Sequence, residues 1–376
     1  MPEILDKSLL FLDRLDARCR SGESFSLMDL TMRLTFDIIG KVVMEADLDA
    51  QSESNPGELV ALSESLAEAY NGDTLNLPWW LTPGKVRRRS ARAAKITNLL
   101  RGIVHQKYAQ LQSSDHPQTT ERSVLSLSLQ DIDTLTPRLV DETCDQLQTF
   151  LFAGHDTTSI LLCWALYELS RTPHALDSIR TELDDFLGPD ASPANIRARL
   201  HVKSNQDALA QLPYLNAVIK ETLRVHPPGG SARFIPPGSG FSVQLPGTEK
   251  EPGERVVLDG LLVYLCQSII HTDPKVFGED AADFLPERWL VKGKGKGKLI
   301  SGPAGAWRPF ERGPRNCIGQ ELANIEARII LALVVRRYDF TKIGIGALSK
   351  DSKTGLPILN EKLQYKVEEE IFVVSF

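Results

Sequence analysis

Apolar residues recur at helical spacing through most of the chain up to Val225. Residues 25–44 (FSLMDLTMRLTFDIIGKVVM) carry them at intervals that predict a buried helix. The longest such pattern starts where Thr136 can cap a helix whose first residue is Pro137. The predicted helices cover about residues 1–20, 25–44, 57–70, 136–171, 173–187 and 213–225.

The pattern changes beyond Val225, where Pro227 and Pro228 stop the last of these helices. The predicted strands are 241–245, 254–258 and 261–265, the next predicted helix is 318–337, and the tail is rich in strand-forming residues. The alternation of strands and helices that a Rossmann core needs is not present. We therefore expect a mainly α fold with small β-sheets in one domain, helix-rich over 1–235, with the sheets and the last helix in 236–376.

The composition is that of a packed soluble protein, because 42% of the 376 residues are hydrophobic and 24% are charged. The 43 basic and 49 acidic residues give a net charge of −6, which argues against nucleic-acid binding through a global positive field. Five cysteines without a C-x-x-C pair favour a reducing compartment over a disulfide framework. The sequence has neither a signal peptide nor an apolar run of about 18 residues, so it encodes no membrane-spanning helix.

One basic segment follows a loop with two adjacent tryptophans, Trp79 and Trp80. Its cationic residues are Arg87, Arg88, Arg89, Arg92 and Lys95. Tryptophan beside arginine and lysine is typical of a peripheral contact with a membrane surface. A solvated basic helix with both tryptophans packed on the core explains the same pattern equally well, and both interpretations stay open.

A loop rich in Gly and Pro presents Cys317 at the start of an apolar helix. The amide groups and the dipole at a helix N-terminus favour a thiolate, and Arg315 adds positive charge. Gly313 and Gly319 permit a tight backbone approach. A cysteine hydrolase would need a histidine base with a supporting signature, and a zinc site would need three or four ligands at short spacing; the sequence has neither. One thiolate bound to a large flat cofactor, as in haem-thiolate ligation, fits better.

The spacing Phe310-x-x-Gly313-x-Arg315-x-Cys317-x-Gly319 resembles the haem-binding signature of the cytochrome P450 family at all five defining positions. The resemblance implies that Cys317 is the axial thiolate ligand of a haem b iron and that the other four residues contact the cofactor. The alternative is a buried cysteine in an ordinary loop.

The segment FLFAGHDTTS places polar residues and a glycine inside the longest predicted helix. Either it forms a kink filled by neighbouring side chains, or Ala153 and Gly154 let a flat ligand lie close to the backbone. It is similar to the (Ala/Gly)-Gly-x-(Asp/Glu)-Thr motif of the P450 helix that crosses the haem. The resemblance implies that Thr157 contacts the bound dioxygen and that Asp156 helps to relay protons. His155 occupies the variable position, so we expect it to be packed or hydrogen-bonded rather than a metal ligand.

A third element pairs Glu221 with Arg224 on one face of the predicted helix that ends at Val225. It matches the family's Glu-x-x-Arg element, and Arg288 lies in a segment that resembles the donor of a second arginine. The resemblance implies a buried structural group of these three side chains that clamps the loop of Cys317. Arg233 stands where relatives place an arginine for a haem propionate.

Together the motifs resemble fungal, microsomal-type members and imply a monooxygenase that inserts one oxygen atom of O2 into an apolar organic substrate in secondary-metabolite biosynthesis. A separate NADPH-cytochrome P450 reductase would supply electrons, because the chain has no flavin or nicotinamide motif. We expect a monomer on the cytosolic face of the endoplasmic reticulum. Residues 1–30 match nothing of the family's front part, so that part is expected to be missing. Two alternatives remain, a catalytically impaired or inactive P450 fragment and a P450-type isomerase or dehydratase.

Overall fold

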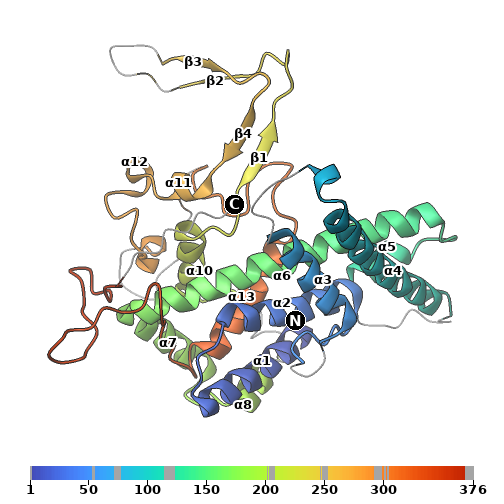
Figure 1. Ribbon diagram of the computed structural model, residues 1–376. Coiled ribbons are helices and arrows are strands. Elements are labelled where there is room, and N and C mark those ends of the chain that lie inside the picture. The colour runs from blue at the N-terminus through green and yellow to red at the C-terminus, as the bar shows by residue number, and fades with distance from the viewer. Residues whose placement is uncertain are drawn as a thin grey trace. The chain divides into compact units, whose positions relative to one another are not determined.

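The structure is a computed structural model that describes residues 2–52, 56–71, 78–113, 123–200, 202, 208–245, 247, 253–291, 299, 302 and 305–368. Within these residues it is mostly helical with two small sheets, as the sequence predicts (Figure 1). The chain divides into two compact units, the first made of residues 1–163, 183–210 and 322–338 and the second of the remaining residues. The strands predicted at the extreme C-terminus lie outside the described residues.

The first unit is built from helices. They include α1 (Pro2–Ser21), α2 (Leu27–Met44), α3 (Glu58–Asn71), α4 (Pro83–Ser113), α5 (Val124–Leu129), α6 (Pro137–Arg171) as far as Cys163, α8 (Pro193–Leu200), the 3-10 turn η1 (Trp79–Leu81) and most of α13 (Gln320–Val334). Their apolar faces form a core that includes Val43, Leu100, Leu129 and Leu147. The apolar residues that recur at helical spacing in the sequence are therefore the residues buried in this core.

Helix α6 (Pro137–Arg171) runs for 35 residues through the polar segment without interruption. The Thr136 hydroxyl caps it by accepting a hydrogen bond of 3.3 Å from the Leu139 amide, and Pro137 takes the first helical position. Both predicted ends of this helix are confirmed. After Thr172, α7 (Pro173–Leu187) follows.

The second unit contains α10 (Pro213–Val225), four short strands and the small helices around them. Strand β1 (Ser231–Phe234) pairs antiparallel with β4 (Leu262–Leu265), and β2 (Ser242–Gln244) pairs antiparallel with β3 (Arg255–Val257). Helices α11 (Gln267–His271) and α12 (Pro274–Phe277) and the 3-10 turn η2 (Pro286–Trp289) complete it. The first strand begins before residue 236, where the sequence predicts the sheet-bearing part to start.

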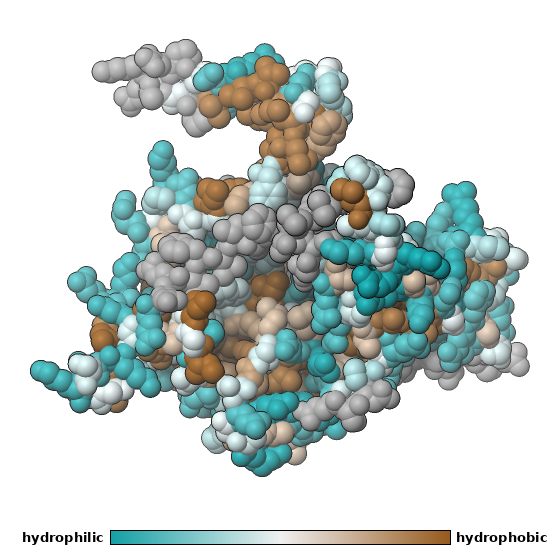
Figure 2. Space-filling model, in the orientation of Figure 1, coloured by the Kyte–Doolittle hydropathy of each residue, from teal (hydrophilic) through white to brown (hydrophobic). Residues whose placement is uncertain are grey.

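The strands of the second unit keep an apolar surface exposed, which Figure 2 shows in brown along these strands. Phe234, Leu262 and Val257 are 63%, 69% and 61% exposed. Two-stranded pairs of three or four residues cannot bury both faces by themselves. Among the described residues, a core cluster of this unit forms where Ala217 of α10 packs with Phe277, Ala281 and Trp289.

Candidate active site

The cysteine loop belongs to the second unit and ends where α13 begins, at Gln320 rather than at residue 318 as predicted. Cys317 is exposed, and its amide donates a hydrogen bond of 2.8 Å to the carbonyl of Phe310. Gly313 has a φ of +85°, a conformation that residues with a side chain rarely adopt. A Cβ on Gly319 would lie 3.8 Å from the Cys317 sulfur. The loop thus folds back on itself and leaves one thiol open at its end.

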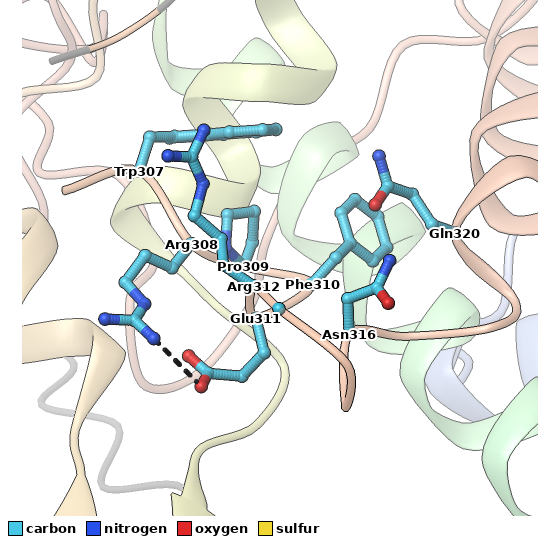
Figure 3. A pocket seen from close by; sticks show the side chains of 9 residues that line it. Trp307, Arg308, Pro309, Phe310, Glu311, Arg312, Asn316 and Gln320 are labelled. Atoms are coloured by element: carbon cyan, nitrogen blue, oxygen red, sulfur yellow. Dashed lines mark hydrogen bonds and ion pairs between the residues drawn. The ribbon is translucent and has the colours of Figure 1, made fainter. Parts of the chain in front are cut away.

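A cavity of about 420 Å³ is formed by the same loop together with the start of α13. Figure 3 shows Phe310, Asn316 and Gln320 grouped together, apart from the ion pair of Arg308 and Glu311. In that pair, the Arg308 Nη2 lies 3.2 Å from the Glu311 Oε2. One part of the cavity is therefore lined by an aromatic ring and two amide side chains, and another part by a charged pair.

A buried histidine anchors the loop to the end of α11. The Arg308 amide donates to the His271 Nε2 at 2.9 Å, and the His271 Nδ1 lies 3.1 Å from the Arg224 carbonyl. Because Nε2 accepts, the ring proton must sit on Nδ1 for both bonds to form. Burial lowers the pKa of His271 to about 4, so the ring is neutral at pH 7. The sequence prediction missed this residue.

A second anchor is aromatic. Trp307 packs edge-on against Trp289 with ring centroids 5.7 Å apart, and its indole N–H donates to the Lys220 carbonyl at 3.2 Å. The Lys220 ammonium lies 4.8 Å and 5.1 Å from the centroids of the two tryptophan rings. Burial lowers the pKa of Lys220. These contacts join the start of the cysteine loop to α10 and η2.

Glu221, Arg224 and Arg288 meet as the sequence predicts. The Glu221 and Arg224 side chains are both fully buried and form a bidentate pair with two N···O distances of 2.8 Å. Arg288 Nε lies 3.5 Å from the same carboxylate, and the Trp289 indole and the Leu285 amide each donate to it at 2.8 Å. The carboxylate is therefore surrounded by donors from two elements.

Arg224 uses all five of its N–H groups. Besides the two bonds to Glu221, it donates to the carbonyls of His271, Ala281 and Asp283. A guanidinium with every donor satisfied can stay buried and charged, whereas an unpaired one could not. Arg224 therefore links α10 to α11 and to the loop that precedes η2.

The two cationic residues that were predicted to bind the cofactor lie at the surface of the second unit. Arg233 is exposed on β1 opposite Val263, and its Nη1 donates to the Ala232 carbonyl at 2.8 Å. Arg315 is exposed in the loop two residues before Cys317. Both are accessible to an anionic ligand group.

The polar segment of α6 belongs to the first unit. Ala153 and Thr157 are exposed one turn apart on the same face of the helix, and the Thr157 hydroxyl donates to the Ala153 carbonyl at 2.8 Å. Asp156 is partly buried. His155 is packed, as predicted, because its Nδ1 lies 2.6 Å from the Leu151 carbonyl. The helix therefore presents an alanine and a threonine outward and keeps the histidine inside.

Gly154 faces α2 on the side where a side chain would project. A Cβ there would lie 2.5 Å from the Ile39 Cδ1, closer than any real contact. The missing side chain of Gly154 thus makes room for Ile39, and any ligand would meet only its backbone. The sequence analysis left packing by neighbouring side chains and contact with a flat ligand both open, and Ile39 is such a neighbouring side chain.

A buried acid near this segment was not predicted. Glu326 on α13 is 1% exposed, and neither carboxyl oxygen has a hydrogen-bond partner among the described residues. Burial raises the pKa of Glu326 to about 8, although the nearby Thr158 hydroxyl lowers it in part. The carboxyl group is therefore mostly protonated at pH 7.

A mainly helical fold with one thiol at the end of a glycine-rich loop, braced by a buried Glu-x-x-Arg pair, defines a haem-thiolate type of protein. The family model for cytochrome P450 matches residues 3–367. The chain therefore belongs to the cytochrome P450 family.

Individual relatives agree with this assignment. Cytochrome P450 monooxygenase polC of the fungus Polytolypa hystricis is 29% identical over 361 residues, which cover 90% of this chain and 59% of polC. A bifunctional cytochrome P450/NADPH–P450 reductase of Gibberella moniliformis is 34% identical over 198 residues, or 53% of this chain and 15% of that protein. The crystal structure of the cytochrome P450 CYP102L1 shares the fold with a TM-score of 0.67 at 22% identity, covering 97% of this chain and 75% of that one.

The family implies a haem iron with a thiolate ligand, and the residues of the loop fit it. Among the described residues, no group of three or more His, Cys, Asp or Glu side chains could hold a metal ion, around Cys317 or elsewhere. One soft thiolate suits an iron whose other ligands come from a porphyrin. The exposed Cys317 would provide the thiolate ligand of the iron. The cationic side chains of Arg233 and Arg315 would bind the propionates.

Proposed function

We propose that the chain is the haem-thiolate part of a monooxygenase, an oxidoreductase that inserts one oxygen atom of O2 into an apolar organic substrate. The observation that carries the proposal is the exposed Cys317 in a loop that His271, Trp307 and the Glu221–Arg224 pair hold to the buried core of its unit. When bound, the haem supplies the redox chemistry that activates dioxygen.

The residues of the chain have separate tasks in this proposal. Cys317 would provide the thiolate ligand, Phe310, Gly313 and Gly319 would shape the loop around it, and Arg315 and Arg233 would neutralise the propionates. Glu221, Arg224 and Arg288 are structural and keep the loop in place.

In the first unit, Ala153 and the backbone of Gly154 would lie against the haem. Thr157, an exposed residue, would turn its hydroxyl from the Ala153 carbonyl to donate a hydrogen bond to the dioxygen, and Asp156 would relay protons from solvent. Because Asp156 is only partly buried, its position suits a group that relays protons from solvent.

The spectrum of the reduced, haem-loaded protein with carbon monoxide tests the proposal. We expect the spectrum of a thiolate-ligated haem, and we expect Cys317→Ala to abolish it, because the sulfur that binds the iron is gone. Cys19→Ala, which removes another exposed cysteine, is the matched control and should leave the spectrum unchanged. Identical spectra for Cys317→Ala and the unmodified chain would refute the proposal.

Electrons are proposed to come from NADPH through a separate reductase. The relative in which a P450 and an NADPH–P450 reductase are joined in one protein supports this source. With such a reductase and isotopically labelled O2, the product should carry one labelled oxygen atom. Product formed without reductase or oxygen would favour an isomerase or dehydratase instead.

The setting proposed for this activity is fungal secondary metabolism, with the protein acting as a monomer at the cytosolic face of the endoplasmic reticulum. None of the described helices is long and apolar enough to span a bilayer. Trp80 and Leu81 are 61% and 55% exposed, and Arg87 and Arg88 are exposed on α4. This supports a peripheral contact through η1. Co-sedimentation with anionic vesicles should fall for Trp80→Ser.

A further inference from the structure

The polar segment of α6 is held by a buried hydroxyl of α2, within the first unit. Thr35 is 0% exposed, and its Oγ1 lies 2.7 Å from the carbonyl oxygen of His155. The same hydroxyl lies 2.9 Å and 3.1 Å from the carbonyls of Thr31 and Met32 in its own helix. A hydroxyl has one proton to donate, and the shortest of the three contacts is the one to α6.

Two apolar side chains of α2 reinforce this contact. Phe36 lies against the His155 ring with centroids 4.8 Å apart and an angle of 56° between the planes. Ile39 occupies the space beside Gly154 where a Cβ would project. Thr35, Phe36 and Ile39 therefore contact two consecutive residues of α6 with a hydrogen bond, a ring contact and an aliphatic contact.

These two residues come directly before Asp156. The carbonyl that Thr35 contacts belongs to the peptide group that joins His155 to Asp156. Because a peptide group is planar, fixing its carbonyl oxygen also fixes the direction of the Asp156 amide and the position of the Asp156 Cα. The orientation of Asp156, and of Thr157 after it, thus depends on the hold from α2.

We propose that Thr35 is a positioning residue that holds the His155–Asp156 peptide group, so that Asp156 and Thr157 keep a single orientation for proton delivery. The inference rests on the proposed function of Asp156 and Thr157. It adds a residue 120 positions away in the sequence that none of the four motifs contains.

Hydrogen exchange measured by mass spectrometry tests the structural half of the proposal in the full chain. Thr35→Val keeps the shape of the side chain and removes the donor. We expect amides of a peptide covering residues 155–163 to exchange roughly five- to tenfold faster, the effect of losing one hydrogen bond. Thr35→Ser keeps the hydroxyl and should restore slow exchange.

Thr31→Val is the matched control. Thr31 is also buried on α2, but its hydroxyl contacts Leu27 and Met28 in its own helix and lies 3.3 Å from the sulfur of Cys163, beyond the polar segment. We expect no faster exchange at the amides of residues 155–159. Equal exchange in Thr35→Val and Thr31→Val would overturn the proposal, whether or not the chain proves to be a monooxygenase.

The functional half is measured as the hydrogen peroxide released per NADPH consumed by the haem-loaded protein with its reductase. A merely structural role for Thr35 would lower the amount of folded protein without changing this ratio. We expect a severalfold higher ratio for Thr35→Val and a normal ratio for Thr35→Ser. A normal ratio in both variants refutes the positioning role, whereas a protein that gives no thiolate spectrum at all refutes the proposed function instead.

Ile39→Ala provides a second route if Thr35→Val accumulates poorly. It loosens the contact beside Gly154 and leaves the hydrogen bond in place. We expect a smaller increase of exchange in the same peptide and a smaller rise in peroxide. An unchanged peptide would show that α2 does not hold this segment.

Discussion

Glu221 and Glu326 are both almost completely removed from water, and their surroundings are opposite. Glu221, in the second unit, is 0% exposed and accepts hydrogen bonds from Arg224, the Leu285 amide and the Trp289 indole. Glu326, in the first unit, is 1% exposed, and neither of its oxygens has a hydrogen-bond partner among the described residues. The same residue type is thus buried as a paired charge in one place and as a protonated acid in the other.

The difference shows two ways of burying a carboxyl group. Pairing keeps the charge and compensates the lost hydration with fixed donors, which tie several segments together. Protonation removes the charge, and the stability of the fold then depends on pH. Glu221 belongs to the first kind and Glu326 to the second.

Glu221→Ala should have the largest effect. Removing the carboxylate leaves the buried guanidinium of Arg224 without its partner, which typically costs about 3–5 kcal/mol of unfolding free energy. Urea unfolding measures the loss, and haem content after purification measures the consequence for the cysteine loop. Glu361→Ala, at an exposed position of the same unit, should change the free energy by less than about 0.5 kcal/mol. A loss below about 1 kcal/mol for Glu221→Ala would contradict the structural role.

Glu326 should make the fold less stable as the pH rises. Its pKa is raised from 4.5 to about 8, so between these values the unfolded chain has released the proton that the folded chain keeps. The stabilisation is complete below pH 4.5 and is lost as the pH passes 8, by up to about 1.4 kcal/mol per pH unit. Glu326→Gln removes this dependence, so the difference in unfolding free energy between the variant and the wild type should change by about 5 kcal/mol across the window. Parallel curves of unfolding free energy against pH would refute this.

His271 should act in the opposite direction at acid pH. Its pKa is lowered from 6.5 to about 4, so in this window the unfolded chain binds a proton that the folded chain rejects. Stability is therefore full above pH 6.5 and falls as the pH drops, by about 3 kcal/mol in total. The difference in unfolding free energy between wild type and His271→Gln should shrink by that amount. His105→Gln, at an exposed histidine, should show no such change.

The sequence predicted what depends on neighbours in the chain. The limits of α6 follow from Thr136 and Pro137, and the pairing of Glu221 with Arg224 follows from their spacing on one helix face. The signature around Cys317 identified the loop because all its defining positions lie within one short segment.

The residues that the sequence missed depend on distant partners. His271 bonds to residues 47 and 37 positions away, and only the fold brings these together. Glu326 lies in an ordinary helical pattern, and nothing local shows that its face is sealed from water. For Gly154 the sequence left packing and ligand contact both open, because its packing against Ile39 depends on how α2 crosses α6.

The smallest expected effect concerns Thr158, a described residue whose polar side chain lies near Glu326. The Thr158 hydroxyl lowers the pKa of this buried acid, and the Thr158 side chain is itself 3% exposed. Thr158→Val keeps the shape and removes the hydroxyl, so it should reduce stability at pH 6 by only about 0.5–1.5 kcal/mol. Because a group that favours the ionised form is gone, the pKa of Glu326 should rise further. The alkaline fall in stability should then extend to a higher pH than in the wild type.

Ser159→Ala separates this effect from the loss of any hydroxyl in the helix. The Ser159 hydroxyl donates to the Asp156 carbonyl in its own helix at 2.7 Å. Its removal should therefore lower stability by a similar small amount at every pH and leave the position of the alkaline fall unchanged. If Thr158→Val moved that fall to lower pH, the hydroxyl would be stabilising the protonated acid rather than the carboxylate. The contrast between Glu221 and Glu326 would then rest on a hydrogen bond to the neutral carboxyl group instead of on burial alone.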